Sequence, residues 1–503
     1  MPDPTRRAAA VALFRRSGEA LEVFLAVRSP KLKAFGGYWA FPGGAVEAGD
    51  GDLPSRLGPE AGSDRATAAC ALREVFEETG LAPLASTSSF ASGPSAEDLR
   101  ELRAALVDER GASPTLKDFL QARALALDGT KLRRIARFIT PGFSATRFDT
   151  TYFLLEASGE PEIIAGELIT GAWHRPADLL GKWRRGGVRV PPPVLAVLDA
   201  LASAPLDDAL RALGSLPERF EGSGRAIPFA PGYALLPLVT PPLPPEIPTN
   251  TILVGATRFL VVDPGPREAG PREHLIAAIE ARIGAGDRLE AVFLTHHHPD
   301  HVGALDAVVE RFRAPVWAHP LAGSLLGRSI DRPIGDGDEI DLGESLDGRA
   351  GWRLRAVFTP GHAEDHMALH DDRFGCLIAG DLLSTLVSMY VGSPGGNIAR
   401  YIASLERIRG LEIETLYPAH GVPSHRAREL IDETIEHRRG RIEEVYARLG
   451  PEPSETEALA RKVYAGAAEP LRPLFVRATR AALEYLVDGG RAEKAGVDSF
   501  RRK

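Results

Sequence analysis

A dense group of metal-binding side-chain types lies at residues 296–301, where the sequence reads His-His-His-Pro-Asp-His. Imidazole nitrogens and carboxylate oxygens are common ligands of zinc. The group follows 291–295, an apolar run typical of a buried strand, and precedes 302–312, whose apolar residues share one helical face. Later strand-like runs also end in a turn residue followed by a candidate ligand: His362, Asp381 and His420. An adventitious surface histidine cluster would not be followed by this ordered set, so the pattern indicates one site for two adjacent zinc ions.

A second candidate site is built from carboxylates. Glu74, Glu77 and Glu78 lie in 66–81, which reads as a helix, and spacings of three and four residues place them on one face. Three such carboxylates repel one another unless a divalent cation lies among them, and oxygen ligands favour Mg²⁺ or Mn²⁺ with substrate phosphates. A solvated acidic helix face is the alternative. The tight Phe-Pro-Gly-Gly turn at 41–44 makes that alternative the weaker one.

Composition limits the class of protein. The chain has 503 residues, a net charge of −8 and 44% apolar residues, which predicts a globular protein of two to four domains. Cys70 and Cys376 are its two cysteines, so we expect no disulfide framework and a cytoplasmic location. The longest apolar runs are too short for a membrane span, and no membrane partner is expected. The negative charge argues against a protein wrapped by nucleic acid.

The elements that position the two sites fall into separate regions. Of 13 histidines, only His174 precedes residue 274, so imidazole chemistry belongs to the later part of the chain. Residues 228–248 are rich in proline and read as an extended connection or an edge segment. Helical patterns dominate after the last candidate ligand. We predict an α/β multidomain chain with domains at 1–215, 216–425 and 426–503.

The carboxylate helix and its turn resemble the Nudix hydrolase signature, Gly-x5-Glu-x7-Arg-Glu-U-x-Glu-Glu-x-Gly-U. The matching residues are Gly44, Arg73, Glu74, Glu77, Glu78, Gly80 and Leu81. Asp50 stands where the signature has Glu, and 51–65 reads as an insertion. The resemblance implies an α/β/α sandwich that hydrolyses a diphosphate, with Mg²⁺ or Mn²⁺ bound by Glu74, Glu77 and Glu78. Arg73, Glu77 and Glu78 would be catalytic, and the identity of the base stays open.

The segment before the turn is similar to the coenzyme A diphosphatase branch of Nudix enzymes. Arg28 and Lys33 keep the spacing of that branch relative to Gly43 and Gly44, with Lys33 where arginine is usual. A basic pair suits a phosphate-rich nucleotide, although strand-edge charge is nearly as good an explanation. The resemblance implies that these four residues bind a small-molecule nucleotide, coenzyme A by preference.

The histidine-rich region resembles the metallo-β-lactamase superfamily in its His-x-His-x-Asp-His, Pro-Gly-His, Gly-Asp and Ala-His motifs. The resemblance implies an αββα sandwich with two zinc ions. By position, one ion would bind His296, His298 and His362. The other would bind Asp300, His301 and His420, with Asp381 bridging. Asp300 would also be catalytic, and two zinc ions would activate water without a serine nucleophile.

Neighbouring residues are assigned by the same resemblance. Asp263 would orient a ligand from outside the metal shell, and His297 falls at a non-ligand position. His366 is intermediate and could contact substrate.

Two further motifs, 359–367 and 395–397, resemble the β-lactamase-like protein 2 branch, which carries a C-terminal winged helix and includes a mitochondrial endoribonuclease. Residues 423–503 carry 16 basic and 14 acidic side chains, too mild an excess to indicate RNA binding by itself. RNA therefore remains an alternative partner. A packing or dimerisation role for this segment, giving a homodimer, is at least as well supported.

Together these features predict a bifunctional metal-dependent hydrolase. A Nudix diphosphatase acting on coenzyme A or a related nucleoside-diphosphate derivative would be joined to a dizinc hydrolase of a phosphodiester or thioester. The alternative is a zinc-dependent endoribonuclease whose Nudix domain is a non-catalytic nucleotide-binding module.

Overall fold

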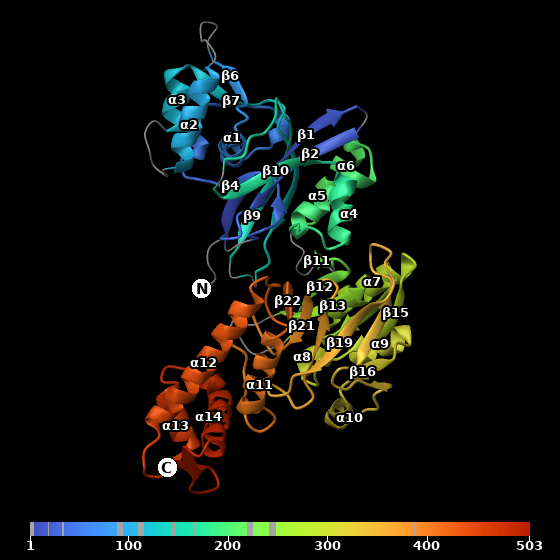
Figure 1. Cartoon of the computed structure of the whole chain (residues 1–503), viewed down its shortest axis with the longest axis vertical. Coiled ribbons are helices and arrows are strands. Elements are labelled where there is room, and N and C mark those ends of the chain that lie inside the picture. The colour runs from blue at the N-terminus through green and yellow to red at the C-terminus, as the bar shows by residue number, and fades with distance from the viewer. Residues whose placement is uncertain are drawn as a thin grey trace. The chain divides into compact units, whose positions relative to one another are not determined.

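The structure is a computed structural model of the chain. It describes residues 5–18, 20–32, 35–87, 94–108, 115–142, 144, 146–164, 166–218, 225–240, 248–386 and 388–503. The chain divides into two compact units, Met1–Ser223 and Gly224–Lys503, coloured blue to green and green to red (Figure 1). The predicted boundaries at 215 and 425 stay predictions.

The first unit is organised around a mixed sheet. Its strands, in spatial order, are β10 (Leu168–His174), β2 (Ala20–Arg28), β1 (Arg6–Ser17), β9 (Phe148–Glu156) and β8 (Arg133–Ile139). Two short strands extend it, β3 (Trp39–Ala40) against β2 and β4 (Gly43–Ala45) against β1. The central strand β1 is parallel to β9 and antiparallel to β2.

Helices cover both faces of this sheet. Because side chains alternate along a strand, Val11 and Leu13 of β1 enter one hydrophobic core and Ala10 and Ala12 enter the other. The first core is closed chiefly by α1 (Arg65–Thr79), α2 (Ala96–Asp108) and α3 (Leu116–Ala122). The second is closed by α4 (Pro176–Arg184), α5 (Pro192–Ser203) and α6 (Leu206–Gly214). The unit is therefore the predicted α/β/α sandwich.

The predicted insertion before α1 has structure of its own. It contains η1 (Asp50–Asp52), β5 (Ser55–Leu57) and η2 (Pro59–Ala61). A small sheet joins β5, β7 (Leu125–Gly129) and β6 (Leu84–Ser86). The turn at β4 and helix α1 still meet, because the insertion folds beside them and not between them.

The second unit contains two facing sheets. One has seven strands in the order β11 (Ile227–Ala230), β12 (Tyr233–Val239), β13 (Pro248–Gly255), β14 (Arg258–Val262), β15 (Arg288–Phe293), β16 (Val316–Ala318) and β17 (Arg332–Pro333). The other has β18 (Glu339–Gly343), β19 (Trp352–Phe358), β20 (Met367–Asp371), β21 (Cys376–Gly380) and β22 (Thr415–Pro418). Tyr233 packs on Tyr417 and Trp352 of the opposite sheet, with ring centroids 5.1 and 6.0 Å apart.

Helices flank each sheet of this unit on its outer side. The seven-stranded sheet packs on α7 (Ala269–Gly284), α9 (Leu305–Phe312) and α10 (Pro320–Leu326). The five-stranded sheet packs on α11 (Ile398–Arg409) and α12 (Ala427–Arg448). The predicted αββα sandwich is confirmed.

The proline-rich stretch 228–248 forms strands β11 and β12 and the start of β13, with β11 at the sheet edge, so it is an edge segment more than a connection. Its residues 241–247 lie outside the described part of the chain.

The C-terminal segment contains α12, α13 (Thr456–Val463), η3 (Glu469–Leu471), α14 (Arg472–Asp488) and a sheet of β23 (Ser454–Glu455), β25 (Ser499–Arg502) and β24 (Ala492–Lys494). The assignment of this segment as a winged helix stays a prediction. Val445, Leu483 and Phe500 belong to one hydrophobic core with Leu377 and Leu416 of the five-stranded sheet. Among the described residues, no helix is both long and apolar enough to cross a membrane.

Candidate metal centres of the two units

The candidate ligands of the second unit lie where strands end. His296 follows β15, His362 follows β19, Asp381 follows β21 and His420 follows β22. Strands β14 and β15 are parallel, as are β21 and β22, so these pairs end at the same edge of their sheets. Each strand carries buried apolar residues and is followed at its carboxyl end by one of these polar side chains. Residues more than a hundred positions apart therefore converge.

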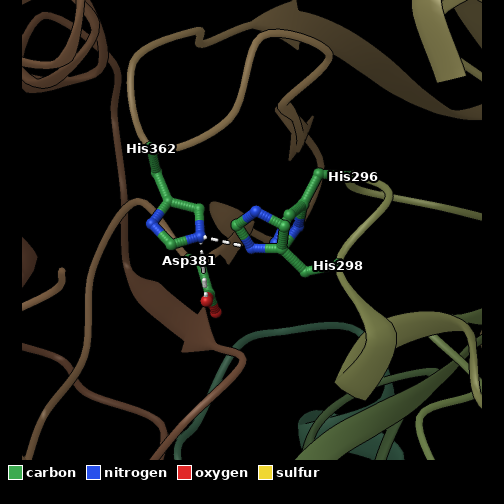
Figure 2. Close-up of side chains that lie close together, drawn as sticks. All are labelled: His296, His298, His362 and Asp381. Atoms are coloured by element: carbon green, nitrogen blue, oxygen red, sulfur yellow. Dashed lines mark hydrogen bonds and ion pairs between the residues drawn. The ribbon is translucent and has the colours of Figure 1, made fainter. Parts of the chain in front are cut away.

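Two groups of ligand atoms form at this edge. In the first, the ligand atoms of His296, His298, His362 and Asp381 all lie within 4.8 Å of one another (Figure 2). In the second, those of Asp300, His301 and His420 do the same. The structure thus brings together all seven residues assigned from the sequence to the zinc site.

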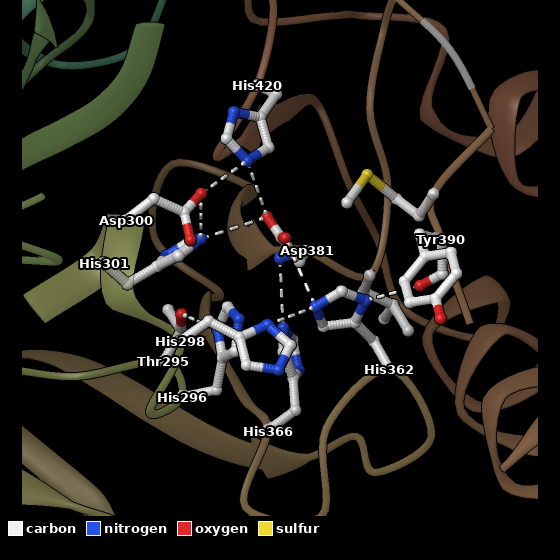
Figure 3. Close-up of polar contacts among 12 residues, drawn as sticks. Thr295, His296, His298, Asp300, His301, His362, His366, Asp381, Tyr390 and His420 are labelled. Atoms are coloured by element: carbon white, nitrogen blue, oxygen red, sulfur yellow. Dashed lines mark hydrogen bonds and ion pairs between the residues drawn. The ribbon is translucent and has the colours of Figure 1, made fainter. Parts of the chain in front are cut away.

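Asp381 lies between the two groups. Its Oδ2 is 3.3 Å from His362 Nε2, whereas its Oδ1 is 3.3 Å from both His301 Nε2 and His420 Nε2 (Figure 3). Each carboxylate oxygen therefore faces a different group. This is the geometry needed for one carboxylate to bridge two cations.

The donor atoms fit a pair of divalent cations. Among the described residues, His296 Nε2 is buried without a hydrogen-bond partner, and the contacts of Asp381 Oδ1 with the rings of His301 and His420 are long, at 3.3 Å. Such atoms are costly unless something binds them. His362 Nε2 and His298 Nδ1 point at one another across 3.0 Å, as two ligands of one ion would.

The histidines of the first group are suited to bind as free bases. Burial lowers the pKa of His296 well below its usual range and that of His298 to about 3. Burial also lowers the pKa of His362. A neutral imidazole keeps a lone pair for a cation, so these ligands need lose no proton on metal binding.

The two histidines of the second group favour the protonated form instead. Burial alone would lower the pKa of His301, but the carboxylates of Asp381, Asp300 and Asp263 raise it well above its usual range. Burial likewise opposes protonation of His420, and Asp381 together with Asp300 raises its pKa to about 10. Without a cation, protons on these two rings offset the carboxylate charge.

Hydrogen bonds from outside the shell fix the imidazole rings. His301 Nδ1 donates to Asp263 at 2.9 Å, and that carboxylate also accepts from the Thr295 backbone and hydroxyl at 2.8 and 2.7 Å. His362 Nδ1 donates to the Tyr390 carbonyl at 2.7 Å and His420 Nδ1 to the Pro248 carbonyl at 3.1 Å. Each ring is thereby held with Nε2 toward the site.

The carboxylate helix of the first unit is anchored by Arg73, which is 6% exposed. Its guanidinium donates to both oxygens of Asp50 at 2.8 and 3.2 Å and to Glu77 at 2.9 Å. It also pairs with Glu74 at 2.9 Å. Asp50 accepts a further bond from the Glu47 backbone at 2.8 Å. Asp50 therefore acts as the counterion that orients Arg73.

The glycine turn and the carboxylates touch directly. The Gly43 backbone N–H donates to Glu78 at 2.7 Å. A Cβ on Gly44 would lie 2.3 Å from Glu74 Oε1, and one on Gly43, whose φ is 156°, would lie 2.2 Å from the Ala9 carbonyl. Glycine at position 44 allows the turn to approach helix α1 this closely, and glycine at position 43 allows it to approach strand β1.

The carboxylates of Glu74, Glu77 and Glu78 have too few positively charged neighbours to balance their negative charge. Burial raises the pKa of Glu74 to about 7 and that of Glu78 well above its usual range, with the negative charge of Glu74 adding to the latter. Burial also raises the pKa of Glu77, against the attraction of Arg73. A divalent cation would relieve this repulsion, so the donor set fits Mg²⁺ or Mn²⁺. In the described part of the first unit, however, no three carboxylates have ligand atoms within 4.8 Å of one another.

Comparisons with known protein families match a region in each of the two units. The model of the NUDIX domain family matches residues 4–109, and that of the metallo-beta-lactamase superfamily matches residues 244–420. The chain joins a NUDIX domain to a metallo-β-lactamase domain. Both families are hydrolases, so the chain is a hydrolase.

Curated relatives align with the metallo-β-lactamase part. A beta-lactamase-like protein 2 homolog of Caenorhabditis elegans is 26% identical over 262 residues, 50% of this chain and 83% of that protein. The lactamase-like protein adaB of Aspergillus niger is 32% identical over 40% of this chain, which spans 58% of that protein. A hydroxyacylglutathione hydrolase of Acidiphilium cryptum is 36% identical over 28% of this chain and 53% of its own length.

Solved structures match each domain. A NUDIX hydrolase from Alicyclobacillus acidocaldarius is 31% identical, with a TM-score of 0.38, and covers 43% of this chain and 100% of its own. A beta-lactamase domain protein from Burkholderia ambifaria is 21% identical, with a TM-score of 0.50, and covers 56% of this chain and 95% of its own.

Two further histidines beside the metallo-β-lactamase site have hydrogen-bonding partners in the structure. His366, an intermediate residue that could contact substrate, is fully buried. Its Nδ1 lies 2.8 Å from the Thr359 hydroxyl, and its Nε2 accepts a bond from the Asp381 backbone N–H at 3.1 Å. It therefore supports the bridging aspartate from behind. His297 is no member of either ligand group and pairs with buried Asp365 at 2.7 Å.

The predicted nucleotide-binding residues of the NUDIX domain are only partly visible. Lys33 lies outside the described residues. Arg28 ends β2, and its Nε is buried without a hydrogen-bond partner among the described residues. The positive charge of Arg28 lowers the pKa of Glu78. Burial and the negative charges of Glu74 and Glu167 raise the same pKa. Arg28 and Glu167 thus lie close enough to the carboxylate helix to act with it.

The sequence did not indicate several contacts that involve backbone carbonyl groups. Arg103 donates to the carbonyls of Glu77 and Glu78, both at 2.9 Å, and so caps the end of α1. The carbonyls of Tyr390 and Pro248 orient two metal ligands. Every residue carries a carbonyl, so no side-chain pattern could have identified these two.

Proposed function

We propose that the chain is a bifunctional metal-dependent hydrolase. The NUDIX domain would use Mg²⁺ or Mn²⁺ to cleave a diphosphate, and the metallo-β-lactamase domain would use two zinc ions. The observation that carries the proposal is Asp381, whose two oxygens face two complete ligand groups. Bound cations would supply Lewis acidity and activate water.

Zinc is favoured over other divalent ions by the donor set. Five imidazoles and two carboxylates serve the two groups, and nitrogen-rich sites of low coordination number suit zinc. His296, His298 and His362 would hold one ion, and Asp300, His301 and His420 the other. Asp381 would serve both ions, and His366 and Asp263 would hold the ligands in place.

We favour a thioester as the substrate of the zinc site. Two curated relatives are named hydroxyacylglutathione hydrolases, and an acylglutathione is a thioester. The charge of residues 423–503 is nearly balanced, which gives little attraction for RNA. A phosphodiester, including RNA, is the competing outcome of the test below.

For the NUDIX site we propose coenzyme A or a related nucleoside-diphosphate derivative. Arg28, whose Nε has no hydrogen-bond partner among the described residues and whose charge acts on Glu78, is suited to meet a phosphate that also contacts a cation. An acyl-coenzyme A contains both a thioester and a diphosphate, so it offers one substrate class to both sites.

A substrate screen of the full-length protein tests these assignments. Coenzyme A, an acyl-coenzyme A, an acylglutathione and a single-stranded RNA would each be incubated with Mg²⁺ or Zn²⁺. Cleavage of the coenzyme A diphosphate in Mg²⁺ and of a thioester in Zn²⁺ is expected. If the protein leaves all the thioesters and coenzyme A intact while cutting RNA, the proposal is wrong and the endoribonuclease alternative stands.

A further inference from the structure

The C-terminal segment reaches the metal centre through one loop. Described residues 388–396 of this loop lie between Asp381 and helix α11. Within it, the Tyr390 carbonyl accepts the hydrogen bond from His362 Nδ1, seen as a dashed line in Figure 3. The position of the loop backbone therefore sets the orientation of a metal ligand.

Arg438 of α12 fixes the neighbouring peptide. Its guanidinium donates to the Met389 carbonyl and lies 3.5 Å from the Ser388 hydroxyl. The side chain is 6% exposed, no carboxylate of the described residues pairs with it, and its Nε is buried there without a hydrogen-bond partner. Burying a guanidinium without a counterion is costly, so ion pairing does not explain its location. Its visible partners are loop groups and an aromatic ring.

That ring belongs to Tyr401, whose centroid lies 5.3 Å from the Arg438 guanidinium carbon. The Tyr401 hydroxyl donates to the Leu382 carbonyl at 2.7 Å, directly after Asp381. Tyr401 also packs against Gly361, where a Cβ would lie 2.3 Å from the Tyr401 nitrogen. One guanidinium thus contacts the supports of both His362 and Asp381.

Helix α14 secures the far end of the same loop. The Ser393 N–H donates to the Arg477 carbonyl at 3.1 Å, and the Arg477 guanidinium donates to the Pro394 carbonyl at 2.7 Å. The Ser393 hydroxyl donates to Glu484 at 3.0 Å. The loop is therefore attached to two C-terminal helices on one side and to a metal ligand on the other.

We propose that Arg438 is a positioning residue of the metal centre, fixing the Met389–Tyr390 backbone and the Tyr401 ring so that His362 and Asp381 keep their separation. The inference rests on the proposed metal function of the second unit. It gives the C-terminal segment a role in the active site beyond packing, and it requires no nucleic-acid partner.

Cobalt binding to the full-length, metal-depleted protein tests this role. We expect Arg438→Met to weaken Co²⁺ affinity about 10- to 100-fold, the range for supports of metal ligands. The visible absorption spectrum of bound Co²⁺ should also change, because His362 or Asp381 shifts in the coordination shell. Arg438→Lys, which keeps the charge but not the planar fork, should show a smaller loss.

Arg491→Met is the matched control. Arg491 also lies in the C-terminal segment, stacks 4.0 Å from the Tyr446 centroid and pairs with Glu443 at 2.5 Å, but has no described contact with the loop. It should leave Co²⁺ affinity and spectrum unchanged.

Three outcomes of the Co²⁺ measurements would contradict either the role of Arg438 or the proposed function. A folded Arg438→Met protein with wild-type Co²⁺ affinity and spectrum overturns the inference. If that variant does not fold, Arg438→Lys decides, and unchanged affinity in it overturns the inference equally. If the wild-type protein itself binds no Co²⁺, the proposed function fails instead.

Discussion

The two sites solve the same problem, binding a divalent cation, with different charge balances. In the metallo-β-lactamase domain, carboxylates alternate with imidazoles, and each negative charge has a titratable partner. In the NUDIX domain, Arg73 serves Asp50, Glu74 and Glu77 at once. Among the described residues, Glu78 has a backbone N–H and the more distant Arg28 as its favourable partners. The first arrangement has its ligand geometry in place without a cation. The second leaves buried carboxylates with raised pKa values, which a cation would lower.

The two sites also differ in how the fold assembles them. The NUDIX carboxylates come from one helix and face a turn about 30 residues earlier, so local spacing sets most of the geometry. The metallo-β-lactamase ligands come from loops after four strands in two sheets. Their geometry depends on the packing of the whole domain. Changes remote from the metal are therefore expected to matter more in the second unit.

The largest expected effect is the loss of one activity, with the other retained, when a single carboxylate is replaced. Asp381→Asn removes a charge shared by both ligand groups and should lower the zinc-dependent activity by about 10³- to 10⁴-fold, equivalent to several kcal/mol. Glu78→Gln should do the same to the Mg²⁺-dependent activity. Each variant should retain the other activity within about twofold, measured as kcat/KM on the same preparation. Loss of both activities in one folded variant would contradict independent sites.

The next effect concerns stability of the first unit. Arg73→Met leaves the 2% exposed Asp50 without its counterion and should lower the free energy of unfolding of that unit by about 3–5 kcal/mol. Hydrogen exchange of the α1 amides, read by mass spectrometry, measures this locally. As a control, Arg134→Met removes a 46% exposed partner of Glu218 and should change stability by less than about 1 kcal/mol. Similar losses in both variants would mean that Arg73 is no special anchor.

A smaller effect tests the supports of the second site. Asp263→Asn removes the charge that orients His301 and should weaken metal affinity about 10- to 100-fold, measured by chelator competition. Asp371→Asn is the control, because Asp371 is also fully buried but bonds Tyr233 and Trp352 away from the ligands. It should lower stability without changing metal affinity. Equal affinity losses would point to a general effect of buried charge.

The smallest effect is a pH dependence of the metal-free NUDIX unit. The Glu74 pKa of about 7 exceeds its value of about 4.5 in an unfolded chain. The folded unit therefore binds more protons between these values, and its stability falls as pH rises through 7. Glu74→Gln should remove about 1–2 kcal/mol of this fall between pH 5 and 8. Hydrogen exchange of α1 at the two pH values measures it, and saturating Mg²⁺ should reduce the wild-type fall. An identical slope in the variant would assign the effect to another group.

Local patterns were the most informative part of the sequence. The spacing of Glu74, Glu77 and Glu78, the glycines of the turn, and the histidine loop after β15 are features of neighbouring residues, and each appears where expected. The α/β/α and αββα layers are implied by the resemblances to the two families, and the structure has both. Helix limits were less predictable: the expected helix over 302–312 is divided into α8 (Pro299–Val302) and α9 (Leu305–Phe312).

Other properties depended on distances that no linear pattern encodes. His366 has the residue type of a ligand, yet the fold turns it behind Asp381, where its Nε2 accepts from a backbone N–H. Asp50 replaces the glutamate of the signature, and its contacts show a counterion of Arg73. In these two contacts the partner lies 15 or 23 residues away, so folding decides whether the contact forms.

The sequence by itself determined which side chains could bind cations and that two regions of the chain would do so. The tertiary structure alone decided that the two oxygens of Asp381 face separate ligand groups, that two carbonyls orient His362 and His420, and that Arg438 contacts the loop beside them. The physical reason is that side-chain chemistry belongs to the residue. Backbone carbonyls are the same in every residue, and only folding selects which of them lies within hydrogen-bonding distance of a ligand.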